Sequence, residues 1–192
     1  MEMNQDLHQL YRAFNLVSAV GCQHIEDQKD QWVFNNDGAV VIHIGATDDR
    51  RSWPIDHWIK LINLLITDFK IAVVDVKDAQ HIINKIKDSR VKIFKGDLIQ
   101  FKSWLTNQKC LVAPDSMAAH LAALLKIPVV TLFGSQDPKL TSPIAEKSLA
   151  ITPGKICSHK RDHWRLCSEC MHSITPNKVY KGICDLMNEV SI

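Results

Sequence analysis

The sequence has few glycines, no long apolar run and no marked excess of charge. Its seven glycines form neither a G-x-G-x-x-G fingerprint nor a Walker A motif, so an ordinary dinucleotide or P-loop site is not expected. No apolar run approaches the roughly 20 residues of a membrane-spanning helix. The formal net charge of +2 is too small to indicate nucleic-acid binding. We therefore expect a globular protein without a membrane span and without a nucleic-acid partner.

A secretion signal is also not expected. The first ten residues, MEMNQDLHQL, do not have a basic head followed by an apolar body, so we predict a cytoplasmic location. In that compartment, six cysteines are expected to be buried thiols or metal ligands rather than disulfides. The hydrophobic content of 46% and charged content of 23% are typical of a soluble folded domain.

The chain divides into a short N-terminal part and one larger domain. Over residues 1–37, the apolar spacing predicts a helix at 5–20, followed by a connector. From residue 38 to 192, short apolar runs alternate with helical patterns. The predicted strands are 39–45, 70–76, 91–94, 110–114 and 127–133. The predicted helices are 54–66, 79–87, 97–105, 116–125 and 175–190. Since the runs are apolar throughout, as in strands buried on both faces, we predict a Rossmann-like α/β domain with helices on both faces of a parallel sheet.

In such sheets, ligands bind beyond the carboxyl ends of the strands. The first predicted strand ends in HIGATDDRRSWP, where Gly45 lets the backbone approach a ligand and Thr47 offers a hydroxyl. Arg50 and Arg51 supply fixed positive charge in a geometry suited to phosphate oxygens. The alternative is a solvated arginine pair in a loop that simply turns.

A second loop places polar groups at the start of the helix predicted for 116–125. Asp115 is predicted to be its N-cap, a purely structural role. Ser116 and His120 are four residues apart, so they share a helix face close to the N-terminus, where free N–H groups attract phosphate. Gly134 follows the fifth predicted strand at the same edge of the sheet. The two loops together predict an anion pocket, which a nucleotide diphosphate fits best.

Three segments of the chain resemble the C-terminal half of glycosyltransferase family 9, the ADP-heptose:lipopolysaccharide heptosyltransferases. They are HIGATDDRRSWPIDHW, APDSMAAHLAALLKIPVVTLFGSQDPKLTSP and C…LCSECMHSITPNKV. The resemblance runs from about residue 38 to the end and implies one half of a GT-B architecture, in which two Rossmann-like domains face each other across a cleft. In this family the C-terminal domain holds the nucleotide-sugar. No further cofactor is implied.

The resemblance also implies roles for individual residues. Thr47 and Arg51 would contact the phosphates, and Asp115 would lie near the sugar. Met117 stands where the family often has glycine, which would narrow the pocket. Asp78 lies near the family's nucleoside-binding acid, although the usual glycine-rich turn is missing. Together with the reasoning from the loops, the predicted donor-binding set is Thr47, Arg50, Arg51, Asp115, Ser116, Met117, His120 and Gly134.

No residue is assigned as a catalytic base. The reaction implied by the resemblance is an inverting displacement at the anomeric carbon, which needs a base to take the acceptor proton. The family's N-terminal domain, which binds the acceptor and supplies that base, has no counterpart here. We therefore expect donor binding, with ADP-heptose as the donor, in lipopolysaccharide or other glycan assembly at the inner face of the membrane. Transfer would need an acceptor-binding domain or a separate chain. The alternative is a non-catalytic partner-binding or assembly module.

The segment 157–172, CSHKRDHWRLCSECMH, is rich in metal-binding side chains. Cys167 and Cys170 have the C-x-x-C spacing of a thiolate chelate, and Cys157 would supply a third ligand. A histidine of the same segment would be the fourth; the candidates are His159, His163 and His172. This pattern predicts a structural zinc or iron site, with scattered cysteines in a solvated basic loop as the alternative.

Overall fold

The computed structural model describes residues 35–46, 48–76, 79–86, 88–155, 157–158 and 167–190. The helix predicted for residues 5–20 lies outside this part of the chain, and so does most of the connector. The boundary between the predicted N-terminal part and the larger domain therefore stays a prediction.

The described residues form one six-stranded parallel sheet with the strand order β3-β2-β1-β4-β5-β6. Its strands are β1 (Val40–Ile42), β2 (Ile71–Val74), β3 (Val91–Phe94), β4 (Cys110–Pro114), β5 (Val129–Leu132) and β6 (Ser148–Ile151). The first strand is central: Val40 is opposite Ile71 of β2 on one side and Cys110 of β4 on the other. This order confirms the predicted Rossmann-like sheet.

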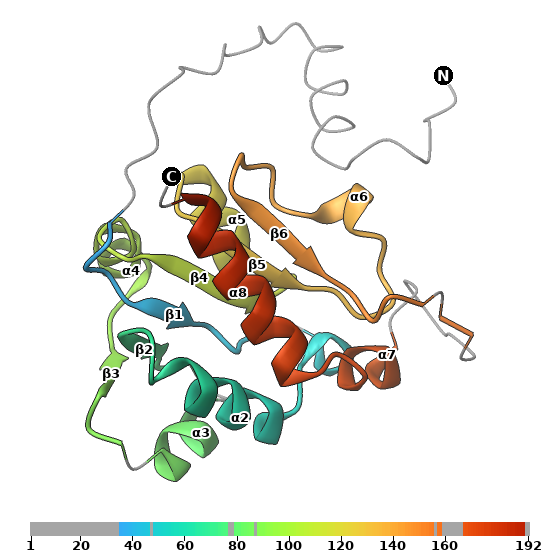
Figure 1. Cartoon of the computed structure of the whole chain (residues 1–192), viewed down its shortest axis with the longest axis horizontal. Helices are drawn as coiled ribbons and strands as arrows, with labels where there is room; N and C mark the ends of the chain where they lie inside the picture. The colour runs from blue at the N-terminus through green and yellow to red at the C-terminus, as the bar shows by residue number, and fades with distance from the viewer. Residues whose placement is uncertain are drawn as a thin grey trace, which may run out of the picture.

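Helices cover both faces of the sheet (Figure 1). One face carries α2 (Ile55–Leu65), α3 (Gln80–Lys85) and α8 (Pro176–Val190), whereas the other carries α4 (Leu98–Leu105) and α5 (Met117–Leu124). Two shorter helices, α6 (Pro138–Thr141) and α7 (Ser168–His172), lie in the loops around β6. No helix within the described ranges combines the length and the apolar character that a membrane crossing requires.

The apolar strands hold the two helical layers together. Successive side chains of β1 point to opposite faces, so Val40 and Ile42 enter the cluster under α2 and α8 while Val41 enters the cluster under α4 and α5. All three are completely buried. Since burial of such a side chain contributes about 1.5–3 kcal/mol, strands that are apolar on both faces stabilise this sandwich most.

Two helices begin with a side-chain cap. Asp97 accepts a hydrogen bond from the Gln100 backbone N–H at 2.8 Å, and the Gln100 side chain accepts one from the Asp97 N–H at 2.9 Å. This reciprocal capping box starts α4. At the start of α8, the Thr175 hydroxyl accepts a hydrogen bond from the Lys178 N–H at 3.3 Å.

The sequence reading missed β6 and α7. The β6 segment SLAI is an edge strand with one neighbour, and only Ile151 is buried. α7 is a single short turn of five residues inside the cysteine-rich segment. Neither is long enough to show a clear hydrophobic period, so their structure depends on contacts made by the rest of the fold.

Candidate functional site

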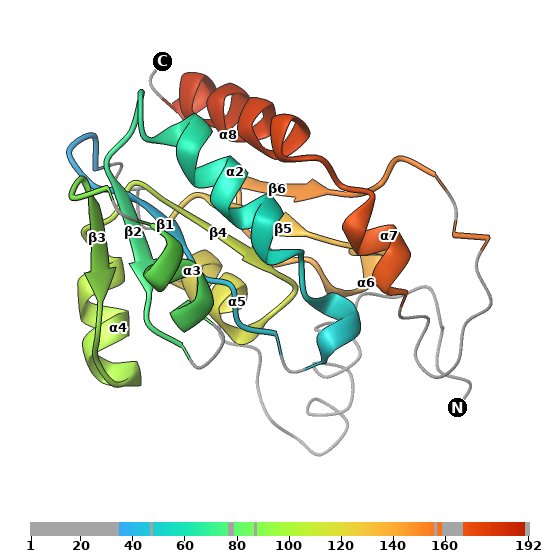
Figure 2. The ribbon, with the colours of Figure 1, turned by 90° about the horizontal axis from the view of Figure 1, so that it is seen from below.

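The candidate site lies where the strand order reverses. From β1, the chain proceeds outward through β2 and β3 and then returns to form β4 on the other side of β1. The loops after β1 and β4 therefore diverge at the carboxyl edge of the sheet, and in this architecture ligands bind between such loops. We call the region between these two loops the crevice. The loop after β1 contains the 3-10 helix η1 (Asp49–Arg51), and the loop after β4 leads directly into α5. In Figure 2 the arrows of β4 and β6 run toward the side on which α7 lies.

Arg51 and Asp115 connect these two loops. Nη1 of Arg51 lies 3.5 Å from Oδ2 of Asp115 and donates a hydrogen bond to the Asp115 backbone carbonyl at 3.4 Å. Oδ1 of the same carboxylate lies 3.7 Å from Nε2 of His120. The Asp115 side chain is only 8% exposed, whereas that of His120 is 49% exposed. One buried carboxylate thus lies between two side chains that can carry positive charge.

The predicted N-cap role of Asp115 is wrong. The cap position of α5 is Ser116, whose backbone is extended at φ −156° and ψ 165°, and the Asp115 carboxylate faces Arg51 instead. Ser116 makes no side-chain capping hydrogen bond, and its buried Oγ has no partner. A buried hydroxyl without a partner is costly in a folded protein. In the same crevice, the buried Nε of Arg51 is also without a partner.

These two groups make an anion site chemically reasonable. A hydroxyl and a guanidinium N–H both donate to phosphate oxygens. The first N–H groups of α5 have no hydrogen-bond partners within the helix. They point out of its N-terminus, which is the positive end of the helix dipole. The structure therefore brings together Arg51, Asp115, Ser116 and His120 from the predicted set.

Arg50 has a different environment from Arg51. Its Nε and Nη2 donate to both carboxylate oxygens of Asp48, at 3.0 and 2.8 Å. Asp48 also caps η1 by accepting a hydrogen bond from the Arg50 N–H. These hydrogen bonds from Arg50 lower the pKa of Asp48 to about 2. The Arg50 guanidinium is therefore engaged locally with its own loop.

Other predicted site residues lie at the edges of the crevice or outside the described residues. Met117 is 58% exposed at the start of α5. Gly134 follows β5 and approaches α7, since a Cβ at this position would lie 3.2 Å from the Met171 backbone nitrogen and 3.4 Å from the Cys167 carbonyl oxygen. Thr47 and Asp78 lie outside the described ranges, so their predicted roles stay predictions.

Two features near the site were not predicted from the sequence, a hydrogen bond of Trp53 and the environment of His43. The Trp53 indole is buried and donates a hydrogen bond to the Ile174 carbonyl at 2.9 Å. This bond ties the loop after β1 to the turn that follows α7. His43 at the end of β1 is largely buried, and its Nδ1 has no partner. The polar letter inside the apolar run VVIHIG was its only sequence signal.

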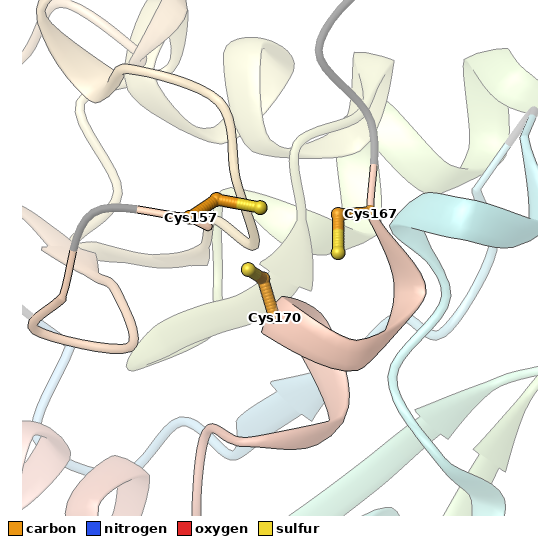
Figure 3. Close-up of side chains that lie close together, drawn as sticks. All are labelled: Cys157, Cys167 and Cys170. Carbon is orange, nitrogen blue, oxygen red and sulfur yellow. The ribbon is translucent and has the colours of Figure 1, made fainter. Parts of the chain in front are cut away.

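Three cysteine side chains lie close together at the N-terminus of α7 (Figure 3). The Sγ atoms of Cys157, Cys167 and Cys170 all lie within 4.8 Å of one another, and their side chains point toward a common space. Cys167 and Cys170 are buried, whereas Cys157 is partly exposed. His172, a predicted fourth ligand, does not belong to this group of ligand atoms within the described part of the chain. His159 and His163 lie outside the described residues.

The geometry of this cysteine cluster fits a thiolate-bound metal. Metal–sulfur bonds of about 2.3 Å at tetrahedral angles place sulfur atoms about 3.8 Å apart, within the observed limit. Burial is the main factor that raises the pKa of both inner thiols, that of Cys170 to about 12. In addition, Cys167 Sγ donates a hydrogen bond to Oε2 of Glu169 at 3.1 Å. Soft thiolate ligands in this arrangement suit zinc or iron.

Comparison with known proteins agrees with this picture. The sequence model of glycosyltransferase family 9 (heptosyltransferase) matches residues 6–169. Lipopolysaccharide heptosyltransferase 1 of Escherichia coli K12 is 32% identical over 108 residues, which cover 53% of this chain and 33% of that protein. Lipopolysaccharide heptosyltransferase 2 of Salmonella typhimurium is 24% identical over 154 residues, which cover 74% of this chain and 44% of that protein.

Solved structures show the same fold. The E. coli heptosyltransferase WaaC with ADP has a TM-score of 0.71 at 20% identity, covering 97% of this chain and 59% of its own. The iron-containing dodecameric glycosyltransferase TibC from enterotoxigenic E. coli H10407 has a TM-score of 0.60 at 17% identity, covering 86% of this chain and 50% of its own. The matched regions thus span between about a third and three fifths of these relatives. On the match of residues 6–169, the chain belongs to glycosyltransferase family 9.

Proposed function

We propose that this chain binds the nucleotide-sugar donor of an inverting glycosyltransferase, with ADP-heptose as the donor. The observation that carries the proposal is a pair of buried polar atoms without hydrogen-bond partners in the region between the loops after β1 and β4. There the buried Ser116 hydroxyl and the Arg51 Nε have no partner, next to the N-terminus of α5. Support also comes from family membership and from the relative WaaC, whose structure contains ADP.

Each side chain then has a physical task toward the diphosphate. Arg51 and the first N–H groups of α5 neutralise its charge, which grows when the bond to the sugar breaks. Ser116 donates its hydroxyl hydrogen to a phosphate oxygen. Asp115 holds the Arg51 guanidinium at the helix start and lies beside His120, whose side chain is 49% exposed.

We propose donor binding without sugar transfer for the 192 residues as they stand. We assign no catalytic base among the residues of the crevice. The heptosyltransferase relatives extend well beyond the region matched by this chain. An acceptor-binding domain or a partner chain would complete the reaction, in lipopolysaccharide or other glycan assembly at the cytoplasmic side of the inner membrane.

Calorimetric titration tests the proposal. We expect ADP and ADP-heptose to bind the wild-type chain with a stoichiometry of one. The Ser116→Ala variant should bind ADP about three- to tenfold more weakly, because it lacks one hydrogen bond to phosphate. UDP-sugars serve as the ligand control. Failure of the wild-type chain to bind either ADP compound would contradict the proposal and favour a non-catalytic assembly module.

We further propose that Cys157, Cys167 and Cys170 hold a structural zinc or iron ion. The observation behind this is the convergence of three Sγ atoms within 4.8 Å, and the related TibC is described as iron-containing. When bound, such an ion would cross-link the segment around α7. Elemental analysis of protein purified under reducing conditions should find about one equivalent of metal per chain, and a content near zero after addition of Zn²⁺ or Fe²⁺ would contradict this assignment.

A further inference from the structure

The cysteine cluster and the donor crevice share a structural element. α7 starts at Cys167, which occupies its N-cap position, and carries Cys170 one turn later. The same helix packs against η1, the 3-10 helix that ends with Arg51 (Figures 1 and 2). The element that supplies two of the three thiols is thus in contact with the loop that supplies the phosphate-binding arginine.

α7 also touches the other loops at this edge of the sheet. Gly134, in the loop after β5, lies so close to α7 that a Cβ there would be in tight contact with Met171 and Cys167. Met171 itself is 1% exposed and belongs to the core under α2 and α8. Just beyond the helix, the Ile174 carbonyl accepts the hydrogen bond from the buried Trp53 indole. α7 and the turn after it therefore contact both the loop after β1 and the loop after β5.

A helix of five residues cannot hold this position by its own hydrogen bonds, because isolated helices of this length are unstable in water. Two thiols at its N-terminal end, those of Cys167 and Cys170, lie within 4.8 Å of the Cys157 thiol. A metal bound by all three would cross-link Cys157 to the N-terminus of α7. The metal would then fix the N-terminal end of α7.

From these contacts we infer that metal binding at Cys157, Cys167 and Cys170 positions Arg51 and thereby raises the affinity of the crevice for the donor diphosphate. The inference rests on the proposed function, since it assigns a control to the same crevice. The cysteines are positioning residues in this scheme, because none of them touches the diphosphate. The coupling is reciprocal: ADP should in turn raise the affinity for the metal.

The test uses the full chain in three forms: wild type loaded with Zn²⁺, the same protein stripped by a chelator under reducing conditions, and Cys157→Ser. Cys157 is the partly exposed member of the cluster, so its replacement disturbs the core least. The matched control is Cys184→Ser, which changes a partly buried thiol in α8, outside the cluster. Metal content, thermal midpoint and ADP dissociation constant are measured for each form.

We expect the stripped wild type and Cys157→Ser to lose the metal, to melt about 5 °C lower or more, and to bind ADP about tenfold more weakly. Cys184→Ser should match the loaded wild type in metal content and ADP affinity. An unchanged ADP affinity after loss of the metal would overturn the coupling while leaving donor binding intact. A wild-type protein that binds no metal would also overturn the coupling, because there would be no metal to position Arg51. If no form bound ADP, the proposed function itself would fail, and the metal content and thermal midpoint would still show whether the metal site exists.

Discussion

Arg50 and Arg51 are neighbours in the sequence, but their guanidinium groups have different surroundings. Arg50 forms a two-point contact with Asp48 in its own loop. Arg51 crosses to the loop after β4 and contacts Asp115, while its buried Nε has no hydrogen-bond partner. The sequence indicated a basic pair suited to phosphate. Which of the two faces the crevice depends on the geometry of η1, which no local pattern shows.

This difference predicts unequal effects of two otherwise similar substitutions. Arg51→Ala should weaken ADP binding by about tenfold or more, because a charge-assisted hydrogen bond to phosphate is lost. Arg50→Ala removes the same charge from the same loop and is the matched control, with an expected change of less than about threefold. Titration with ADP measures both. Equal losses in the two variants would mean that the crevice does not distinguish the arginines.

His43 predicts an acid-dependent loss of stability. Burial lowers the pKa of His43 from 6.5, so the folded protein keeps the ring neutral where the unfolded chain already takes up a proton. The free energy of unfolding should therefore be highest above about pH 6.5 and fall as the pH decreases through that value. His57, whose pKa is also lowered by burial, adds to the same trend.

Urea unfolding at about pH 7.5 and about pH 5.5 measures this effect. In His43→Gln the buried ring is absent, so the loss of stability between the two pH values should be smaller than in the wild type. The remaining slope would come from His57 and the other titrating groups. An identical slope in the variant would show that His43 is protonated equally easily in the folded and unfolded chain.

At the scale of elements, the five predicted strands and the helices predicted from residue 54 onward were confirmed because each contains its own signal. The strands β1, β2 and β4 are apolar on both faces, and α4 begins with a capping box encoded by Asp97 and Gln100. The site was less predictable. Asp115 precedes a helix and has the side chain of a good N-cap, yet it pairs with Arg51, which is 64 residues away in the sequence. Long-range pairs of this kind have no periodic pattern.

The contact between β5 and α7 yields a prediction at this scale. Gly134→Ala should lower the free energy of unfolding by about 1–3 kcal/mol, because the new methyl group would lie 3.2–3.4 Å from atoms of Met171 and Cys167. Gly134→Ser provides a graded comparison and should cost more, since it adds one further atom. Urea unfolding measures both variants. A wild-type free energy of unfolding in both variants would contradict this prediction, because it would show that α7 can move away from the new side chain without loss of stability.

At the scale of the whole molecule, the strand order explains why distant residues form one site. The order β3-β2-β1-β4-β5-β6 makes β1 and β4 neighbours although 67 residues lie between Ile42 and Cys110. The polar residues at the ends of these two strands are thereby brought to one crevice. The sequence supported this arrangement through its alternating pattern, while the resemblance to family 9 supplied the donor chemistry.

The central claim is that the crevice between β1 and β4 holds the donor diphosphate. A crystal structure of the chain with ADP bound tests it most directly. We predict the diphosphate at the N-terminus of α5, with phosphate oxygens within about 3.2 Å of the Arg51 guanidinium and the Ser116 hydroxyl. ADP bound at another place, with Arg51 and Ser116 unchanged and without phosphate contacts, would contradict it.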